Sequence, residues 1–339
     1  MAPEFQEANC AAVILARGEG AGLSSYIFGY HLFGYHLFGY HLPKQFCPLF
    51  DGKTLLGETL DRVSLVVPRS KTVAVLNRAH ERFYSRLVDG MSARNCFIQP
   101  ENRGTAPAIL GALLRLIESG HTGAVAIFPS DHYVADDTKF MRHVARAFSA
   151  VDRSPQLIVL LGITPDGPEN EYGWIEPGTP AADTHPAFAQ IARIRSFWEK
   201  PSPAVACELC ERGYLWNSFI VIADAVVLLS LIAVAVPELY LAMTRVRSFF
   251  GTGIEDEVLG SVYRDLPVVD FSGSVLAASP TELSVLPVAG VGWSDLGDQK
   301  RLLAAISSGG QRISVGTPTT ATRLFPVTTG GQERITRNI

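Results

Sequence analysis

The stretch AAVILARGEGAG, residues 11–22, joins a short apolar run to a glycine-rich turn. A run of this length that ends in a turn is typical of a strand buried within a parallel sheet. Comparable runs recur along the first two-thirds of the chain, each followed by a polar or glycine-rich turn. The predicted strands are Ala11–Ala16, Thr72–Leu76, Ala124–Phe128 and Leu157–Gly162.

Helix-like stretches separate these apolar runs, and the alternation indicates the fold class. The predicted helices are Lys53–Leu65, Ala79–Asp89, Ala106–Glu118 and Thr138–Val151. Strands that alternate with helices predict an α/β protein, with a mostly parallel sheet covered on both faces. In such sheets ligands bind at the carboxyl ends of the strands, so the loops after each strand are the candidate functional segments.

The composition excludes several classes of protein. Of the 339 residues, 47% are hydrophobic and 18% are charged, and the formal net charge is −4. A chain this long and apolar can bury a full core, which excludes global disorder. The balance of charge argues against nucleic acid as a partner. The five cysteines suggest no disulfide framework, and the first residues do not resemble a secretory signal. Both observations predict a cytoplasmic protein.

One apolar segment, residues 219–236, has about the minimum length of a membrane span. Asp224 lies inside it, and Pro237 ends it. A buried strand followed by a helix with Asp224 as its N-cap explains both features. We therefore predict no association with a membrane.

Two motifs raise the question of a bound metal. The pentad FGYHL occurs three times without interruption in residues 28–42, but no carboxylate accompanies its histidines. A period of five fits neither a helix nor a strand, and we interpret the repeat as a tandem duplication. Cys207 and Cys210 form a lone CxxC pair, which we interpret as two cysteines on one helical face.

The loops after the predicted strands carry the residues suited to chemistry. The glycine-rich turn after Ala16 could present backbone N–H groups to a phosphate, although tight turns also use glycine for conformation alone. In ENRGTAPAI, Thr105 is the expected N-cap of the following helix. Asp131 follows a predicted strand, where a carboxylate commonly holds Mg²⁺ beside a phosphate or simply caps the next turn.

Eight motifs together resemble a known family. In order they are LARGEGAGL, PKQF, ENRGTAPAI, FPSDH, GITPDGPENEYGWIEPG, FWEKP, YLWNSF and WSDLGD. The series resembles the sugar-nucleotide pyrophosphorylases, most closely the bacterial mannose-1-phosphate guanylyltransferases, from about Ala11 to about Asp298. The resemblance implies a three-layer Rossmann-like, GT-A-like nucleotidyltransferase domain with a mixed, mostly parallel sheet over residues 1–304. A tail or small β appendage is expected over residues 305–339.

The resemblance also implies a site and a reaction. It assigns Lys44 and Asp131 to catalysis; Gly18, Gly20, Arg103, Gly104 and Thr105 to the nucleotide; Asp131 and Asp295 to Mg²⁺; and Tyr172, Gly173, Glu199, Lys200 and Asn217 to the sugar phosphate. The implied substrates are GTP and mannose 1-phosphate, and the products are GDP-mannose and pyrophosphate. Because the reacting oxygens are already ionised, no general base is required. A homodimer is the default expectation for such an enzyme.

The sequence departs from the family pattern L-A-G-G-x-G-T-R-L in the first turn. Arg17 stands where the family has a glycine, and Gly22 stands where it has the arginine that stabilises pyrophosphate. Losing one such cation costs about 10²–10³ in rate. We ask whether Arg17 supplies the missing charge. Two of the three pentads lengthen the same loop, and Phe219 replaces a small residue, where it is expected to crowd the sugar side.

Three hypotheses follow from these residues. The first is an active Mg²⁺-dependent mannose-1-phosphate guanylyltransferase, at a full or an impaired rate. The second is a catalytically silent paralogue that binds a sugar nucleotide as a regulatory subunit. The third is a pyrophosphorylase for another sugar 1-phosphate or nucleotide.

Overall fold

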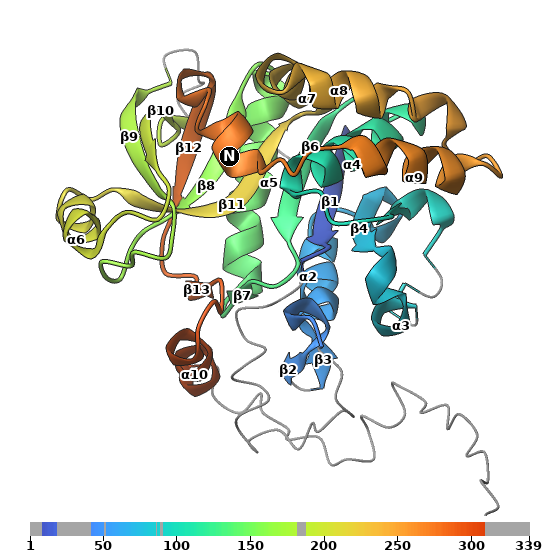
Figure 1. Ribbon diagram of the computed structural model, residues 1–339. Coiled ribbons are helices and arrows are strands. Elements are labelled where there is room, and N and C mark those ends of the chain that lie inside the picture. Colours follow the sequence, from blue (N-terminus) through green and yellow to red (C-terminus); the bar gives the residue numbers. More distant parts are fainter. Residues whose placement is uncertain are drawn as a thin grey trace, which may run out of the picture.

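The apolar run that opens the sequence forms β1 (Cys10–Ala16), and all seven of its residues are buried. The computed structural model describes residues 9–18, 42–50, 52–85, 87–88, 91–181 and 188–308. Strand β1 pairs in parallel with β4 (Thr72–Asn77) and with β6 (Ala124–Pro129). It lies inside the main sheet (Figure 1), which explains why polar residues are absent from it.

Within the described residues, the main sheet has nine strands in the order β5-β4-β1-β6-β11-β8-β12-β10-β9. The remaining strands are β5 (Cys96–Gln99), β8 (Ile158–Ile163), β9 (Trp174–Pro180), β10 (Ala192–Trp198), β11 (Leu215–Asp224) and β12 (Leu283–Val288). Strands β10 and β11 pair antiparallel with their neighbours, and the other seven run in one direction. The sheet is therefore mixed and mostly parallel, as expected.

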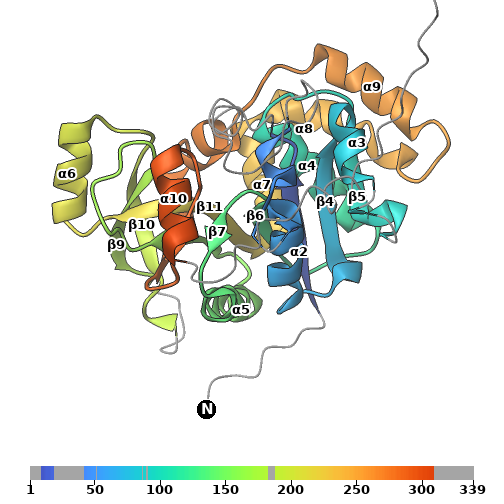
Figure 2. The same cartoon turned by 90° about the horizontal axis from the view of Figure 1, so that it is seen from below.

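Helices cover both faces of this sheet and give three layers. Helices α2 (Leu55–Ser64) and α5 (Asp137–Arg153) contribute to one apolar core. Helices α4 (Thr105–Glu118), α7 (Ala225–Ala235) and α8 (Pro237–Thr244) contribute to a second core. Figure 2 shows α5 on one side of the sheet and α7 and α8 on the other. Alternate residues of β1 enter the two cores, as the strand period requires.

The apolar segment at 219–236 divides as predicted. It forms the end of β11 and then α7, and the Asp224 side chain accepts hydrogen bonds from the N–H groups of Val226 and Val227 at the start of the helix. Among the residues that the structure describes, no helix is both long enough and apolar enough to span a bilayer. The expectation of a buried strand and a capped helix is confirmed.

Other predicted helices change in extent. The helix expected at Ala79–Asp89 is reduced to a 3-10 turn at Arg78–His80 and the single turn α3 (Glu81–Tyr84). Helix α6 (Pro203–Glu211) carries the CxxC pair, with Cys207 exposed and Cys210 half-buried. Helix α9 (Glu255–Asp265) contributes Leu259 and Tyr263 to the core that also contains α4.

Two small sheets lie beside the main sheet. Strand β2 (Pro48–Phe50) pairs with β3 (Lys53–Thr54), and β7 (Tyr133–Val134) pairs with β13 (Trp293–Ser294). In the second pair Ser294 lies opposite Tyr133, which brings the residues after β13 to the end of β6. This pairing joins two segments that are remote from each other in the chain.

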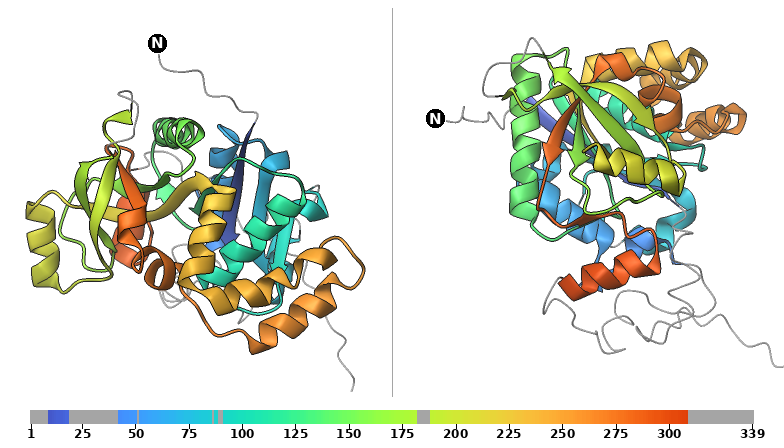
Figure 3. Two further views of the ribbon diagram at one scale, coloured as in Figure 1. Left: turned by 90° about the horizontal axis from the view of Figure 1, so that it is seen from above. Right: turned by 90° about the vertical axis from the view of Figure 1, so that its left-hand side faces the viewer.

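The boundary expected at residue 304 falls inside a helix. After β13 the chain forms α10 (Gln299–Ser308), the orange-red helix in Figure 3. Leu302 and Ala305, three residues apart on one face of this helix, are buried in an apolar cluster with Cys47 and Leu49. The residues after 308 lie outside the described residues.

Candidate active site

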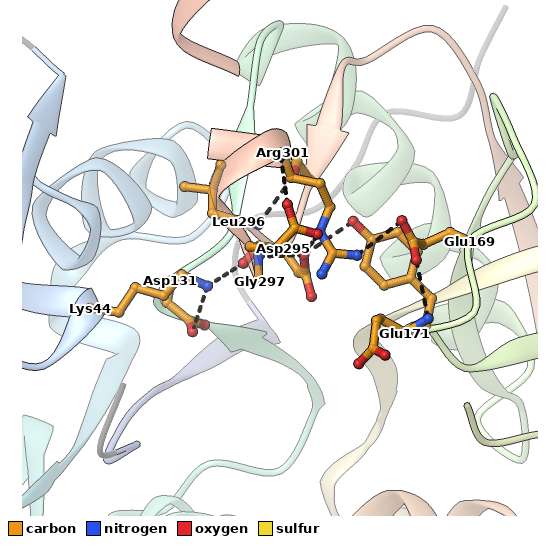
Figure 4. Close-up of polar contacts among 11 residues, drawn as sticks. Lys44, Asp131, Glu169, Glu171, Asp295, Leu296, Gly297 and Arg301 are labelled. Atoms are coloured by element: carbon orange, nitrogen blue, oxygen red, sulfur yellow. Dashed lines mark hydrogen bonds and ion pairs between the residues drawn. The ribbon is translucent and has the colours of Figure 1, made fainter. Parts of the chain in front are cut away.

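Lys44 is the side chain around which three distant segments meet. It lies in a 3-10 turn, Lys44–Phe46, and only 6% of the residue is exposed. Its Nζ is 3.1 Å from Oδ2 of Asp131, which follows β6, and it donates a hydrogen bond to the backbone oxygen of Asp295, after β13 (Figure 4). The sequence predicted a role for all three residues, and the structure brings them together.

The electrostatics at Asp131 follow from this lysine. Burial alone would raise the pKa of Asp131, but the charge of Lys44 and the neighbouring His132 hold the pKa below its ordinary value. Burial lowers the pKa of His132 to about 4, against the attraction of Asp131. At neutral pH the site therefore contains an ionised carboxylate, a lysine and a neutral imidazole.

The carboxylate of Asp295 is held mainly through one oxygen. Oδ1 accepts hydrogen bonds from the Tyr172 hydroxyl at 3.1 Å and the Gly297 N–H at 2.8 Å, and it lies 3.3 Å from Nε of Arg301. Within the described residues, Oδ2 accepts no hydrogen bond. Tyr172 was expected to line the sugar pocket, and the structure places its hydroxyl against Asp295.

These carboxylates fit a metal that takes most of its ligands from a substrate. In the part of the chain that the structure describes, no group of three or more His, Cys, Asp or Glu residues is arranged to hold a metal. Mg²⁺ usually takes one or two protein carboxylates and fills its other positions with phosphate oxygens and water. Asp131 and Asp295 supply two such carboxylates, and Lys44 contacts the carboxylate of Asp131 and the backbone oxygen of Asp295.

A cavity of about 240 Å³ lies beside Asp131. Its wall includes Leu15, Arg17, Gly18, Gln45, Thr105, Pro129, Ser130, Asp131, His132 and Phe219. Gln45 donates to the backbone oxygens of Gly18 at 2.7 Å and Ala16 at 3.3 Å, which fixes the end of β1 against the lysine turn. Gly18 and Thr105 thus border one cavity, as expected. Gly20, Gly22 and the pentads before Leu42 lie outside the described residues.

Arg17 projects into the same region. Its Nη1 donates a hydrogen bond of 2.6 Å to Oδ1 of Asn102, which also accepts from the N–H of Gly104 at 3.3 Å. Burial lowers the pKa of Arg17, with Asp270 and Asp131 among the groups that oppose the shift. A guanidinium stays protonated even so, and Arg17 therefore adds a cation to the cavity wall.

The ENRG segment, residues 101–104, contains Arg103 and Gly104, which were expected to contact the nucleotide. Arg103 pairs with Glu101 at 2.8 Å and donates to the backbone oxygen of Arg264. Gly104 has a φ of +91°, and a Cβ there would overlap the backbone of Val269. Neither residue belongs to the cavity wall because the segment is tied by backbone hydrogen bonds to Val269 rather than left open.

Thr105 is the member of this group that reaches the cavity, but it does not act as the N-cap. Helix α4 begins at Thr105, with Gly104 in the cap position. The Thr105 hydroxyl donates to Oδ1 of Asp270 at 2.8 Å and accepts from the N–H of Phe271 at 2.6 Å. Asp270 is a site residue that sequence reasoning missed, since its own segment carried no recognised motif.

Three of the predicted sugar-phosphate residues meet at the start of β9. A Cβ placed on Gly173 would lie 3.1 Å from Oε2 of Glu199 and 3.4 Å from Cβ of Asn217. Burial raises the pKa of Glu199, and the charge of Asp270 adds to this, while Lys200 opposes it. Lys200 has a φ of +44°. The absence of a side chain at Gly173 therefore lets Glu199 and Asn217 pack closely against its backbone.

Phe219 follows Asn217 on β11 with a φ of +62°, a backbone conformation that favours glycine. Its ring makes an edge contact with Phe271, with 6.2 Å between centroids. Phe219 was expected to crowd the sugar side, and the structure places it in the wall of the cavity with Arg17 and Asp131.

Comparison with known proteins identifies the class. The family model described as nucleotidyl transferase matches residues 38–311, and the chain therefore belongs to the nucleotidyl transferase family. The observed three-layer α/β fold with its mixed sheet agrees with this family. The resemblance to the sugar-nucleotide pyrophosphorylases is confirmed at the level of family and fold.

The relatives are similar over most of this chain. The alginate biosynthesis protein AlgA of Pseudomonas syringae pv. tomato is 27% identical over 260 residues, which is 75% of this chain and 52% of AlgA. An Escherichia coli mannose-1-phosphate guanylyltransferase is 24% identical over 261 residues, 75% of this chain and 55% of that protein. The chain thus spans about half the length of the curated relatives it matches.

A solved structure from Thermus thermophilus, described as a mannose-1-phosphate geranyltransferase, superposes with a TM-score of 0.73. It is 28% identical, and the alignment covers 88% of this chain and 79% of that one. The arrangement of strands described above is therefore one that a solved relative shares.

Proposed function

We propose that this protein transfers a nucleotidyl group from a nucleoside triphosphate to a sugar 1-phosphate, with GTP and mannose 1-phosphate as the preferred pair. One observation carries the proposal: Lys44 bridges Asp131 and the backbone of Asp295 beside a cavity at the carboxyl end of the sheet. Buried lysine and carboxylate groups at this edge suit polyphosphate chemistry. The names of the E. coli and T. thermophilus relatives support mannose 1-phosphate as the sugar substrate.

The chemical step balances without a general base. A phosphate oxygen of mannose 1-phosphate attacks the α-phosphorus of GTP and forms a new P–O bond. The bond from that phosphorus to the oxygen bridging it to the β-phosphorus breaks, and the electron pair leaves with pyrophosphate. Lys44 neutralises the negative charge while that charge moves from the attacking oxygen to the leaving oxygen.

Mg²⁺ is the cofactor of this proposal. Asp131 and Asp295 would hold it, and it would neutralise phosphate charge as a Lewis acid. The protein's own contribution is to orient the two substrates. Gly173, Glu199 and Asn217, which lie together, would orient the sugar phosphate. Thr105, Arg17 and Gly18, which line the cavity beside Asp131, would orient the nucleotide.

A pyrophosphate-release assay tests the proposal. The purified chain is incubated with each of GTP, ATP, UTP and dTTP and with several sugar 1-phosphates, with and without Mg²⁺. We expect release that needs both substrates and Mg²⁺ and is fastest with GTP and mannose 1-phosphate. No release with any pair would refute nucleotidyl transfer, and a faster pair would replace GTP or mannose in the proposal.

A second candidate function rests on the wall of the cavity. Arg17 and Phe219 place large side chains where related turns carry glycine or small residues, and both line the cavity. A chain with a narrowed cavity would bind a sugar nucleotide as a regulatory subunit and not turn it over. Binding of GDP-mannose in a titration calorimeter without pyrophosphate release would favour this candidate. Turnover gained by Arg17→Gly would identify the obstruction.

A further inference from the structure

Arg301 enters the site from α10 and contacts three carboxylates. Its Nε is 3.3 Å from Oδ1 of Asp295 and 3.2 Å from Oδ2 of Asp298, and its Nη1 is 3.3 Å from Oε2 of Glu169. The guanidinium also lies over the ring of Tyr172, 4.7 Å from its centroid. Only 13% of the side chain is exposed. Figure 4 shows Arg301 between Asp295 and Glu169.

Two contacts of neighbouring residues in α10 fix the position of Arg301. Asp298 accepts a hydrogen bond of 2.9 Å from the backbone N–H of Arg301, as an N-cap residue does. Leu302, the next residue, is buried in a small apolar cluster with Cys47 and Leu49. That cluster directly follows the turn that carries Lys44. Lys44 and Arg301 therefore reach Asp295 from one packed unit.

The contacts of Arg301 make the two oxygens of Asp295 unequal. Oδ1 accepts hydrogen bonds from Tyr172 and Gly297 and lies nearest to Nε of Arg301, whereas Oδ2 accepts no hydrogen bond within the described residues. Without the arginine, Asp295 would face Asp298 and Glu169 with no cation between them. Neighbouring like charges repel, and the Asp295 carboxylate would rotate away from the other two.

We propose that Arg301 is a positioning residue, which holds Oδ1 of Asp295 so that Oδ2 is presented to a divalent cation. This inference rests on the proposed function, because it assigns Asp295 to the metal of that reaction. Partners of metal-binding carboxylates act in this way, and their loss typically costs about 10–100-fold in metal affinity.

An opposing effect has to be weighed, because a cation 3.3 Å from a metal ligand also repels the metal. Here Asp298 and Glu169 lie as close to the guanidinium as Asp295 does. These two charges largely compensate that of Arg301, so its repulsion of a metal is small and its ion pair with Asp295 acts mainly by fixing the position of that carboxylate. The two effects predict opposite signs for the change in metal affinity when Arg301 is replaced.

The test measures binding of Mn²⁺ to the full chain with no nucleotide or sugar phosphate present, from the loss of the free-ion electron paramagnetic resonance signal. We expect Arg301→Met to weaken Mn²⁺ binding by about tenfold or more. Arg301→Lys keeps a cation and should recover part of the affinity. Tyr172→Phe removes the other side-chain donor to Oδ1 and should weaken binding to a smaller extent.

Arg212→Met is the matched control. Arg212 also lies over a tyrosine, Tyr214, and pairs with Glu208, but 57% of its side chain is exposed and it belongs to the end of α6. Its replacement should leave Mn²⁺ affinity unchanged. Thermal unfolding of each variant shows whether it folds. If Arg301→Met does not fold, the Mn²⁺ affinity of Tyr172→Phe tests the inference in its place.

Unchanged or tighter Mn²⁺ binding in folded Arg301→Met would overturn the inference, and so would the absence of saturable Mn²⁺ binding by the unmodified chain. Neither result would bear on nucleotidyl transfer, which is measured separately by pyrophosphate release. Conversely, weaker Mn²⁺ binding would stand even if the chain released no pyrophosphate.

Discussion

The two sides of the proposed active site place different neighbours against their glycines. On the sugar side, a Cβ on Gly173 would lie 3.1 Å from Oε2 of Glu199 and 3.4 Å from Cβ of Asn217, which are side-chain atoms. On the nucleotide side, a Cβ on Gly104 would overlap the backbone of Val269. A side chain can shift to admit a Cβ more readily than packed backbone can, so the two glycines are expected to differ in how well they tolerate alanine.

The largest expected effect lies between the two sides, at Lys44. Lys44→Met removes the cation that faces Asp131, and we expect turnover to fall by about 10²–10³. The measurement is the steady-state rate of pyrophosphate release. Lys53→Met is the control, since Lys53 pairs with Asp61 on the surface and 59% of its side chain is exposed. Equal losses in both variants would show that Lys44 has no special role.

Replacement of Gly104 is expected to have the next largest effect, on stability. Gly104→Ala combines a positive φ with an overlap against Val269, and we expect a loss of about 3 kcal/mol in the free energy of unfolding. Chemical denaturation measures it. Gly213→Ala is a matched control, because Gly213 also has a positive φ of +74° but nothing lies within 4 Å of its Cβ position. Similar losses at both positions would contradict the packing role of Gly104.

The pH dependence of stability tests the burial of His132. Its pKa is about 4 in the folded chain and about 6.5 when unfolded, so the unfolded chain binds more protons between these values. The free energy of unfolding should fall by about 2 kcal/mol as the pH drops from 6.5 to 4. His132→Phe keeps the ring contact with Trp293 and should lose most of this slope.

His143→Asn, which changes a half-buried ring on α5, serves as the comparison for His132→Phe and should keep most of the slope. Above pH 7 the difference between the unmodified chain and His132→Phe should not vary with pH. A slope that survives in His132→Phe would mean that another group is responsible.

The smallest effect is expected at Gly173. An alanine there would place its Cβ 3.1 Å from Oε2 of Glu199, which must shift by a few tenths of an ångström. We expect KM for the sugar phosphate to rise about tenfold, with KM for the nucleotide and the stability nearly unchanged. Gly178→Ala, whose Cβ would lie at the same 3.1 Å but from the backbone oxygen of Arg193 where β9 meets β10, provides the control for local crowding. If Gly173→Ala changed KM for the nucleotide as well, Gly173 would not belong to a separate sugar-phosphate side of the site.

Part of the site could be predicted from the sequence because its residues follow directly from strands. Asp131 comes just after β6, and the apolar run before it predicts the end of that strand to within one residue. Tyr172 and Gly173 show the limit of such reasoning. The two residues are adjacent in the chain, yet the Tyr172 hydroxyl contacts Asp295 whereas Gly173 lies against Glu199. A motif places both residues in the site without saying which one meets the ligand.

Arg301 and Asp270 illustrate what no local pattern indicates. Arg301 follows a motif by three residues and acts only because α10 packs on the turn after Lys44. Asp270 contacts Thr105, 165 residues earlier in the chain. Both contacts cross between elements whose neighbourhood is set by the packing of the whole chain.

The sequence by itself determined the alternation of strands and helices, the family, and the residue types at the ends of the strands, since these depend on local periodicity and on short motifs. The tertiary structure decided that Lys44 meets both Asp131 and Asp295, that Arg103 and Gly104 pack away from the cavity, and that Arg301 reaches Asp295. The physical reason is that burial and pairing of charge depend on distances between segments that are remote in the chain. A sequence pattern of a few residues does not contain those distances.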